Sequence, residues 1–331
     1  MPIFPLDPRN PDRDVLRRAA ELLRGAELVA FPTETVYGLG ANALDENAVQ
    51  KIFALKQRPS YNPLIVHVED EDAAQSVVES WPQSARDLAR EFWPGPLSLV
   101  LPRRAGVSDS VTAGLKSVAV RAPAHPVAQM LLRECGVPLA APSANRFTCL
   151  SPTTAQHVAG AFPDLFVLDG GACAVGIEST VLDLSGATPI LLRPGAVSQA
   201  QIVAIIGPVG LPSDYSGDAP RPSPGLVEKH YAPRAELFIV PPNQLHARLE
   251  KNTVSNRKSG VLSRDATDLK NPGGLHHIVT MAQDAIDYAR ELYAALHALD
   301  AENCVEILVE EMPDGEAWRG VRDRLSRAAK K

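Results

Sequence analysis

The sequence predicts an α/β protein with two domains. Its 331 residues exceed what a single hydrophobic core usually holds. Segments with apolar residues at helical spacing alternate with short apolar runs typical of buried strands. The composition changes over 207–225, which is dense in Pro, Gly, Ser and Asp. We therefore predict a first domain over 1–206, a linker over 207–235 and a smaller second domain over 236–331.

The first domain begins with a predicted helix over 12–25, which ends at Gly25, and a strand over 27–31. A second helix over 45–57 follows, with Asp45 as its expected N-cap. Further strands are expected at 63–68, 97–102, 117–123, 137–145, 165–171, 179–185 and 189–195, and further helices at 84–93, 125–135 and 153–162.

The second domain contains a long predicted helix over 281–299. It alternates with strand-like runs, which predicts a parallel sheet. These runs are 235–240, 259–263, 276–280 and 304–310.

Bulk composition favours some classes of function over others. The net charge is -6 at pH 7, and the short basic runs at 103–104 and 324–331 are interpreted as solvated faces, so a small-molecule site is favoured over a nucleic-acid groove. There is no basic start followed by an apolar run, and no apolar stretch of membrane length. The four cysteines are scattered without a CxxC pair, which argues against zinc and disulfides and favours the reducing cytoplasm.

The segment 32–44, "PTETVYGLGANAL", is predicted to be a loop. Its GLGANA matches the GxGxxA dinucleotide fingerprint, but Pro32 and polar residues separate it from the preceding strand. The chain has no GxxxxGK[ST] loop either. We interpret Gly38 and Gly40 as positions where the backbone passes close to a neighbouring group.

Polar side chains lie at the ends of predicted strands in three clusters. A helix cap would explain one threonine of the first cluster, and an Asx or Ser turn is the ordinary alternative for the second. Small hydroxyl and amide groups after strands are also typical of ligand sites in α/β sheets. The clusters are Thr33, Glu34, Thr35 and Tyr37; Ser143, Asn145 and Ser151; and Glu178, Ser179 and Thr180.

Four cations lie beside prolines near strand ends: Lys56, Arg58, Arg121 and Arg193. Each one alone could be part of a solvated turn or a surface ion pair. Together with the hydroxyl clusters they predict a polyphosphate pocket at one edge of a sheet. No Ser-His-Asp order, HExxH motif or nucleophilic cysteine context is evident.

Taken together, these segments resemble a known family. "FPTETVYGLGANA", "KQRPSYNPLIVHV", "FWPGPLSLVLP", "VAVRAPAHPVA", "PLAAPSANRFTCLSPTTAQHV", "GIESTVLDL" and "LLRPG" are similar to the YrdC-like domain of threonylcarbamoyl-AMP synthases. "SPGLVEKHYAP" and "VRDRLSRAAKK" resemble the linker and second domain of the long form of that family. The resemblance implies a twisted mixed YrdC-like sheet with helices and a smaller Rossmann-like α/β domain.

It also implies an activity. Members of the family are nucleotidyltransferases that condense L-threonine, bicarbonate and ATP, with Mg²⁺, into threonylcarbamoyl-AMP and pyrophosphate. The product serves formation of N6-threonylcarbamoyladenosine in tRNA through a separate transferase. The expected partners are therefore these small molecules and that transferase, with tRNA at most a weak ligand and no membrane.

The resemblance assigns roles position by position. Lys56 and Arg58 are the expected catalytic cations, and the linker is expected to fold over the first domain's pocket as a lid. The threonine side comprises Thr35, His67, Arg121, Ala141 and Ser179. The ATP side comprises Arg58, Asn62, Ser117, Ser143, Asn145, Ser151, Arg193 and Tyr231.

Two other functions compete with this one. The first is a carbamoyl-adenylate-forming domain of the kind found in hydrogenase maturation proteins, which also carry CxxC arrays and an acylphosphatase-like module that this chain lacks. The second is an RNA-binding module, against which the acidic balance and the lack of interleaved aromatic residues count.

Overall fold

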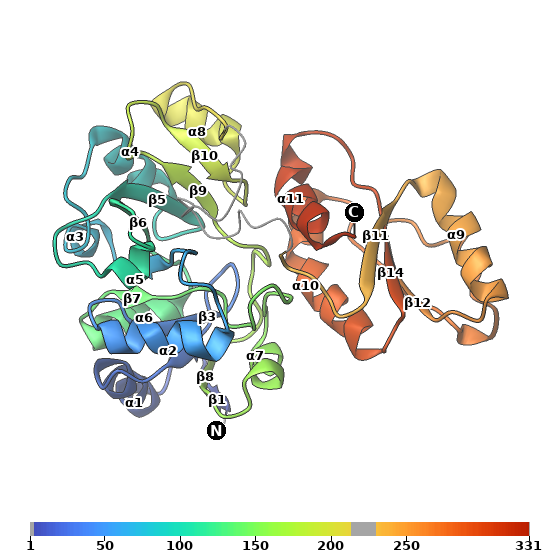
Figure 1. Ribbon diagram of the computed structural model, residues 1–331, viewed down its shortest axis with the longest axis horizontal. Coiled ribbons are helices and arrows are strands. Elements are labelled where there is room, and N and C mark those ends of the chain that lie inside the picture. The colour runs from blue at the N-terminus through green and yellow to red at the C-terminus, as the bar shows by residue number, and fades with distance from the viewer. Residues whose placement is uncertain (1–2, 213–229, 331) are drawn as a thin grey trace. The chain divides into compact units, whose positions relative to one another are not determined.

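A computed structural model describes residues 3–212 and 230–330 and divides the chain into two compact units. The first unit contains most of the N-terminal part, and the second contains the C-terminal part together with Thr148–Ser151 and Val175–Ile177 (Figure 1). Of the linker predicted over 207–235, residues 213–229 lie outside the described part, and so does most of the segment expected to form a lid.

The first unit is built on one ten-stranded sheet. Neighbouring strands are parallel in some pairs and antiparallel in others, so the expected mixed sheet is confirmed. In spatial order the strands are β1 (Ile3–Pro5), β8 (Phe166–Asp169), β2 (Val29–Phe31), β3 (Gly38–Asn42), β7 (Leu139–Ala140), β4 (Ile65–His67), β6 (Ser117–Arg121), β5 (Leu97–Pro102), β9 (Thr180–Asp183) and β10 (Ile190–Arg193).

Helices form hydrophobic cores on this sheet. The Asp12 side chain caps α1 (Arg13–Arg24), which packs with α6 (Pro126–Cys135) over β2 and β8. A larger core holds α2 (Glu46–Lys56), which Asp45 caps as expected. The other helices of the unit are α3 (Glu71–Ala74), α4 (Gln83–Phe92), α5 (Asp109–Thr112), α7 (Ala155–Ala161) and α8 (Gln199–Ile206).

One part of the sheet has a small apolar cluster made of strand residues. Ile65, Val100, Ala119, Val181 and Leu192 come from β4, β5, β6, β9 and β10. The neighbouring positions in these strands face the larger helical core instead. This half of the sheet therefore presents a face with an apolar floor, on which polar side chains at alternating positions can gather.

The segment 38–42 forms strand β3, so the prediction of a loop over 32–44 was wrong there. Two glycines and the polar residues before them hid the strand, because glycine has a low preference for strands. The tertiary contact explains the glycine: a Cβ on Gly40 would lie 2.8 Å from the ring of Phe31 on the neighbouring strand. The interpretation of close backbone approach is confirmed, and no phosphate loop forms.

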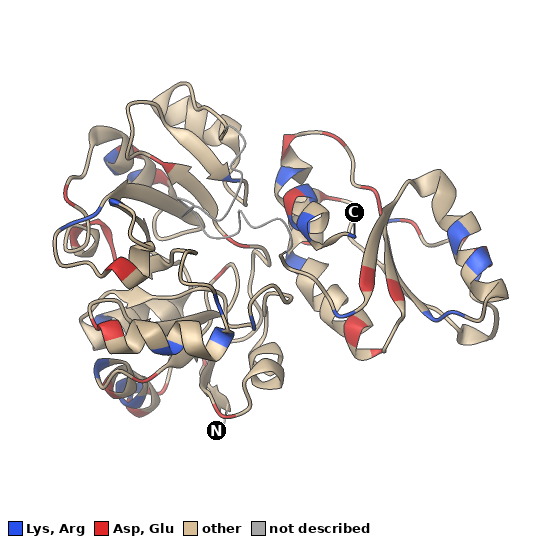
Figure 2. Cartoon of the chain, in the orientation of Figure 1, with Lys and Arg blue, Asp and Glu red and all other residues tan. Residues whose placement is uncertain are grey.

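Charged residues are rare in the ten-stranded sheet, whose strands are mostly tan in Figure 2. Within the described strands only Arg121, Asp169, Asp183 and Arg193 are charged, and each is the last residue of its strand. A charge in mid-strand would be buried on one face of the sheet at a large desolvation cost. Two of the four candidate cations are therefore strand-terminal, as the sequence predicted.

The second unit contains a four-stranded parallel sheet with the order β11 (Glu236–Val240), β14 (Glu306–Glu310), β12 (Ser259–Ser263) and β13 (His277–Thr280). Helix α9 (Pro242–Val254) lies on one face, and α10 (Ala285–Ala301) and α11 (Arg319–Ala328) lie on the other (Figure 1). This confirms the Rossmann-like class.

The basic run at 324–331 is only partly a solvated face. The side chain of Arg324 is 1% exposed, pairs with Asp323 at 2.8 Å, and lies over the ring of Tyr231. The run is helical as far as Ala328, and helical geometry points Arg324 into the core of the unit while Ser326 stays exposed. The interpretation of the whole run as solvated was therefore wrong for Arg324.

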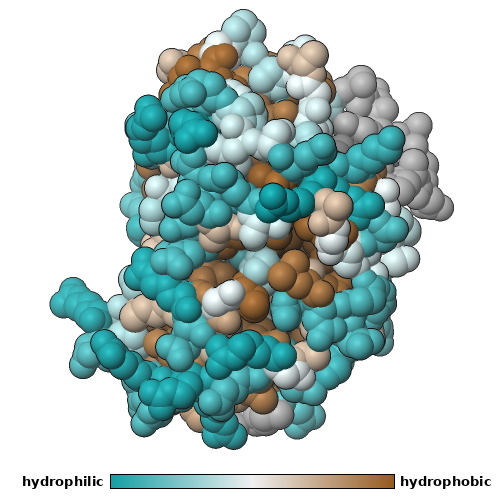
Figure 3. Space-filling view, turned by 90° about the vertical axis from the view of Figure 1, so that its left-hand side faces the viewer, coloured by the Kyte–Doolittle hydropathy of each residue, from teal (hydrophilic) through white to brown (hydrophobic). Residues whose placement is uncertain are grey.

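The face shown in Figure 3 is mostly hydrophilic, with hydrophobic residues gathered in a hollow near the middle of the view. Within 3–212 and 230–330, no helix combines the length and apolar character needed to cross a bilayer.

Candidate substrate-binding site

Arg121 is the centre of the candidate site. Its side chain is 4% exposed and forms an ion pair with the buried carboxylate of Glu34 at 2.6 Å. It also donates to Thr35 Oγ1 at 2.9 Å and to the Gly95 carbonyl at 3.1 Å. The second oxygen of Glu34 accepts from the backbone N–H of Ala124 at 2.9 Å. The guanidinium is thus fixed in one orientation by three acceptors.

Some N–H groups of Arg121 remain available to a ligand. A guanidinium has five N–H groups. Three are spent on Glu34, Thr35 and Gly95, which leaves two without an acceptor among the residues that the structure describes. Because Glu34 neutralises the charge, recognition here depends on directed hydrogen bonds as much as on net charge. Two donors on one planar group suit a carboxylate.

The hydroxyl of Thr35 also has a fixed role. Thr33 Oγ1 donates to the Val36 carbonyl at 2.6 Å, so the hydrogen between the two threonine hydroxyls, 2.8 Å apart, comes from Thr35. Thr35 Oγ1 then accepts from Arg121. One of its lone pairs remains available for an N–H of a ligand.

His67 is the neighbour of Arg121 on the adjacent parallel strand. Burial and the positive charge of Arg121 lower the pKa of His67 to about 3, so the ring is neutral near pH 7. Its buried Nδ1 has no hydrogen-bond partner in the described part of the chain. A buried polar atom left alone costs roughly 1–3 kcal/mol, which a bound ligand can recover.

The depressed pKa has a consequence for stability. In the unfolded chain His67 takes up a proton below about pH 6.5, whereas the folded chain does so only near pH 3. The unfolded state then binds more protons, so this contribution to stability is present above pH 6.5 and is lost as the pH falls. We expect His67 to account for about 2 kcal/mol of the fall in unfolding free energy between pH 7 and pH 5.

Urea unfolding at both pH values of wild type and of His67→Gln measures this difference. Phe31→Leu is the matched control, because it loses the edge contact between the two rings and keeps the histidine. It should keep the wild-type pH dependence. An equal fall in the His67 variant would show that the histidine is not held neutral.

The two cations of the "KQRP" segment lie in a second group. The buried ammonium of Lys56 donates to the carbonyls of Ser143, at 2.6 Å, and Asn145. Arg58 donates to the carbonyls of Asn62, at 3.1 Å, and Pro63, at 2.9 Å. Both cations therefore hold the loops that carry other predicted ATP-side residues.

Asn62 adds a second buried polar atom that lacks a protein partner. Its Nδ2 has no acceptor within the described residues. The Arg58 guanidinium lies over the ring of Phe147, with its carbon 5.8 Å from the centroid. An amide donor beside a stacked guanidinium suits an oxygen-rich ligand.

Arg193 forms the third group with Ser179. It donates to the Ser179 carbonyl at 3.0 Å and to its hydroxyl at 3.1 Å. That hydroxyl lies 2.8 Å from the hydroxyl of Ser98, which is fully buried. Gly195 lets this turn pack closely, since a Cβ there would lie 2.4 Å from the backbone nitrogen of Thr180.

Backbone hydrogen bonds connect the three groups. Ala144 N–H donates to the Tyr37 carbonyl at 2.8 Å, which links the "PSAN" loop to the segment that carries Thr33 and Thr35. Thr180 N–H donates to the Pro96 carbonyl at 2.9 Å, next to the Gly95 carbonyl that holds Arg121. These bonds tie the loops of the second and third groups to segments next to the residues that hold Arg121.

The predicted residues of the first unit do not converge at one edge of the sheet, so that prediction was wrong. Strand β7 runs antiparallel to β4, which places Ala141 and His67 at opposite ends of the neighbouring strands. What His67, Ser117 and Arg121 share is a face, since they alternate with core positions alongside Ile65 and Ala119. Relative strand direction is a tertiary property that the local sequence does not contain.

Two predicted ATP-side residues belong to the second unit. Tyr231 is 1% exposed, and its ring lies 6.0 Å from that of Tyr293 and beneath the Arg324 guanidinium. Ser151 is fully buried, and its carbonyl accepts from the ring of His297 at 3.1 Å. Their contact with a nucleotide stays a prediction.

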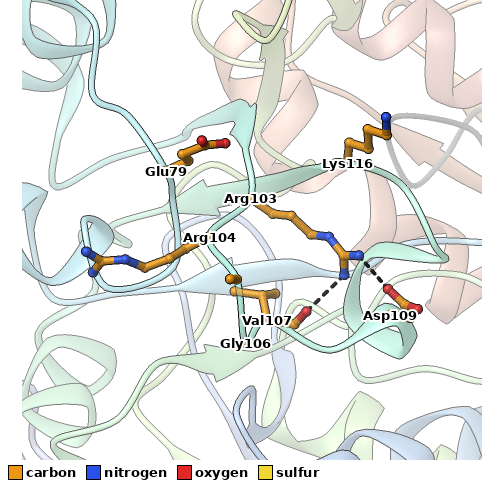
Figure 4. Close-up of a pocket in the computed structure, with 8 residues that line it drawn as sticks. Glu79, Arg103, Arg104, Gly106, Val107, Asp109 and Lys116 are labelled. Atoms are coloured by element: carbon orange, nitrogen blue, oxygen red, sulfur yellow. Dashed lines mark hydrogen bonds and ion pairs between the residues drawn. The ribbon is translucent and has the colours of Figure 1, made fainter.

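A pocket of about 750 Å³ in the first unit contains none of the predicted residues. It is lined by the 103–107 loop, Glu79, Asp109 and Lys116. Figure 4 shows Arg103 reaching Asp109, with which it pairs at 2.6 Å. Arg103 also donates to the Val107 carbonyl at 2.9 Å. Its charge is compensated within the loop, so this pocket is not the candidate site.

The site includes residues that were not assigned to it from the sequence. Glu34 was noticed in its cluster but received no role, and Ser98 and Gly95 were not singled out. Ser98 sits in an apolar strand, where a lone serine gives no signal. Its partner Ser179 is 81 positions away. In the described part of the chain, no three His, Cys, Asp or Glu side chains are placed to hold a metal ion.

Comparisons with known proteins match both units. A family described as "Telomere recombination" matches residues 21–195, and one described as "Threonylcarbamoyl-AMP synthase, C-terminal domain" matches 197–330. The chain is 41% identical to the threonylcarbamoyl-AMP synthase of Bacillus subtilis, over 95% of this chain and 92% of the relative. It is 40% identical to that of Pyrococcus abyssi, with 95% and 94% covered.

The fold also matches a solved structure. The crystal structure of Pyrococcus abyssi Sua5 complexed with L-threonine superimposes with a TM-score of 0.93 at 37% identity, covering 99% of this chain and 98% of that one. The similarity runs through both units. The chain belongs to the family of threonylcarbamoyl-AMP synthases.

Proposed function

We propose that this protein is a nucleotidyltransferase that condenses L-threonine, bicarbonate and ATP into threonylcarbamoyl-AMP and pyrophosphate. The observation that carries the proposal is the buried Arg121, with two N–H donors left over beside the acceptor oxygen of Thr35. A carboxylate and an adjacent amine are what this pair can hold, and an α-amino acid has both. The Pyrococcus abyssi relative was crystallised with L-threonine.

The chemistry asks the protein mainly for positioning. The amine of threonine and bicarbonate give a carbamate and water, and a carbamate oxygen then attacks the α-phosphorus of ATP while pyrophosphate leaves. Arg121 and Thr35 would hold the amino acid, and Arg58, Asn62 and Arg193 would face the nucleotide. Holding both reactants in line can supply several kcal/mol of the rate enhancement.

Mg²⁺ belongs to the substrate in this proposal. It would enter bound to the triphosphate, whose oxygens are the ligands it prefers. The product would pass to a separate transferase that modifies tRNA, in a cytoplasmic pathway, and tRNA itself would bind weakly at most.

Pyrophosphate release with each substrate left out in turn tests the proposal. We expect turnover only when L-threonine, bicarbonate and ATP are all present. L-Serine at the same concentration is the matched control for the side-chain methyl group. Release that is indifferent to threonine would contradict the assignment. Salt-dependent RNA binding without any ATP turnover would favour the RNA-binding alternative instead.

A further inference from the structure

The sheet of the second unit has a point where its connections diverge. In the order β11-β14-β12-β13, the two central strands are β14 and β12. The chain leaves β12 toward β13, at one edge of the sheet. After β14 it continues into α11, which packs against β11 at the opposite edge. Ligands of open α/β sheets bind outside the carboxyl ends of the strands at such a switch point. The carboxyl ends of β12 and β14 are therefore the place to look for a further site.

Those ends carry a fixed carboxylate. Ser263 and Glu310 are the last residues of β12 and β14. Glu310 is 6% exposed and accepts from Ser263 Oγ at 2.8 Å, from Arg264 N–H at 2.8 Å and from the Arg264 guanidinium at 2.5 Å. Burial opposes ionisation, but these hydrogen bonds outweigh it and hold the pKa of Glu310 below its usual value.

Two buried donors near Glu310 have no acceptor among the described residues. Tyr288 on α10 is fully buried, and its hydroxyl has no hydrogen-bond partner among the described residues. Burial, together with the charge of Glu310, raises the pKa of this phenol, so it keeps its proton and remains a donor. The Nε of Arg264 is likewise buried without a partner in the described part of the chain.

The Arg264 guanidinium is also held in place. It lies over the ring of Trp318, with its carbon 5.6 Å from the centroid, and the Trp318 ring meets that of Tyr288 edge-on at 5.4 Å. Only one of the five guanidinium N–H groups reaches an acceptor within the described residues. The Arg264 side chain is 19% exposed, so part of it borders solvent, while its Nε and the Tyr288 hydroxyl are buried.

We propose that Arg264 and Tyr288 form a binding site for a small oxyanion, a carboxylate or a phosphate, at the carboxyl ends of β12 and β14. The groups left over are all donors, which calls for an acceptor-rich ligand. Glu310 and Trp318 orient the guanidinium. Because Glu310 also neutralises it, binding depends on directed hydrogen bonds, and simple anions will bind weakly. The site is independent of the reaction proposed for the first unit.

Fluorine NMR of the full chain labelled with 5-fluorotryptophan tests this. The protein has three tryptophans. Trp318 contacts Arg264, whereas Trp81 and Trp93 pack against each other in the first unit and serve as internal controls. Inorganic phosphate and acetate are titrated separately, which shows whether a phosphate or a carboxylate is preferred. We expect a saturable shift of the Trp318 signal alone.

Variants locate the site. Arg264→Gln and Tyr288→Phe should each weaken binding about 10- to 100-fold, the loss typical of one hydrogen bond to a charged group. Arg248→Gln is the matched control, since Arg248 pairs at 3.1 Å with Glu306, the first residue of β14, at the opposite end of that strand. Circular dichroism checks folding, and if Arg264→Gln unfolds, Tyr288→Phe decides.

Two results would overturn the proposal. One is a Trp318 shift that stays linear in anion concentration, as expected if Tyr288 and Arg264 are satisfied by water alone. The other is a saturable shift that neither variant weakens, which would place the bound anion elsewhere.

Discussion

Removing the Arg121 side chain is expected to cost both stability and activity. In Arg121→Ala, the buried carboxylate of Glu34 would lose its partner, which costs roughly 3–5 kcal/mol of unfolding free energy. The threonine-side hydrogen bonds would be lost as well. We expect kcat/KM for L-threonine to fall roughly 100-fold or more, because two charge-assisted donors disappear.

A paired substitution separates the two effects. Arg121→Met together with Glu34→Gln removes both charges, and replacing a buried pair as a unit is often close to neutral for stability. We expect the double variant to regain most of the unfolding free energy in urea and to stay inactive. If it regained threonine-dependent turnover, Arg121 would have only a structural role. Glu34→Gln alone keeps the arginine and should raise KM for threonine without abolishing turnover.

Lys56 is expected to be the second most sensitive position. Its ammonium satisfies the carbonyls of Ser143 and Asn145, and Lys56→Met would leave them buried without this donor. At about 1–3 kcal/mol for each of the two carbonyls, we expect a loss of roughly 2–6 kcal/mol in the free energy of unfolding. KM for ATP should rise, because the "PSAN" loop would no longer be held.

Lys51 is the matched control, because it lies on the same helix and is also paired. Its partner is Glu27 at 2.7 Å, and the two side chains are 43% and 56% exposed. An exposed pair contributes about 1 kcal/mol or less, so Lys51→Met should have little effect on urea unfolding. If the two methionine variants proved equally stable, Lys56 would not be what holds the loop.

Lys56 and Arg58 are close in the sequence but hold different loops, which the sequence did not reveal. Lys56 and Arg58 were both predicted as phosphate-facing catalytic groups. In the structure each donates to backbone carbonyls of nearby loops. Whether they also contact phosphate stays a prediction. A side chain's partner depends on which loop folds back over it, and for Lys56 that loop is 87 residues away in the chain.

Local signals in the sequence were enough to determine much of the architecture. Asp45 and the apolar spacing after it determine α2, and the uninterrupted "LSLVLP" determines β5, because capping and side-chain periodicity act over a few residues. The motif set likewise identified the family. Its assignment of Arg121 and His67 to the threonine side stays a prediction, although the structure does place the two residues side by side on neighbouring strands.

Tertiary structure alone decided how those residues are used. It made a strand of 38–42, in which Gly40 leaves room for the Phe31 ring of the neighbouring strand. It paired Arg121 with Glu34 across 87 residues and buried Arg324 against Tyr231. It also placed the site on a face of the sheet, since strand direction brings distant side chains together or apart. These contacts join residues far apart in sequence, and no local pattern specifies which distant partner a side chain will meet.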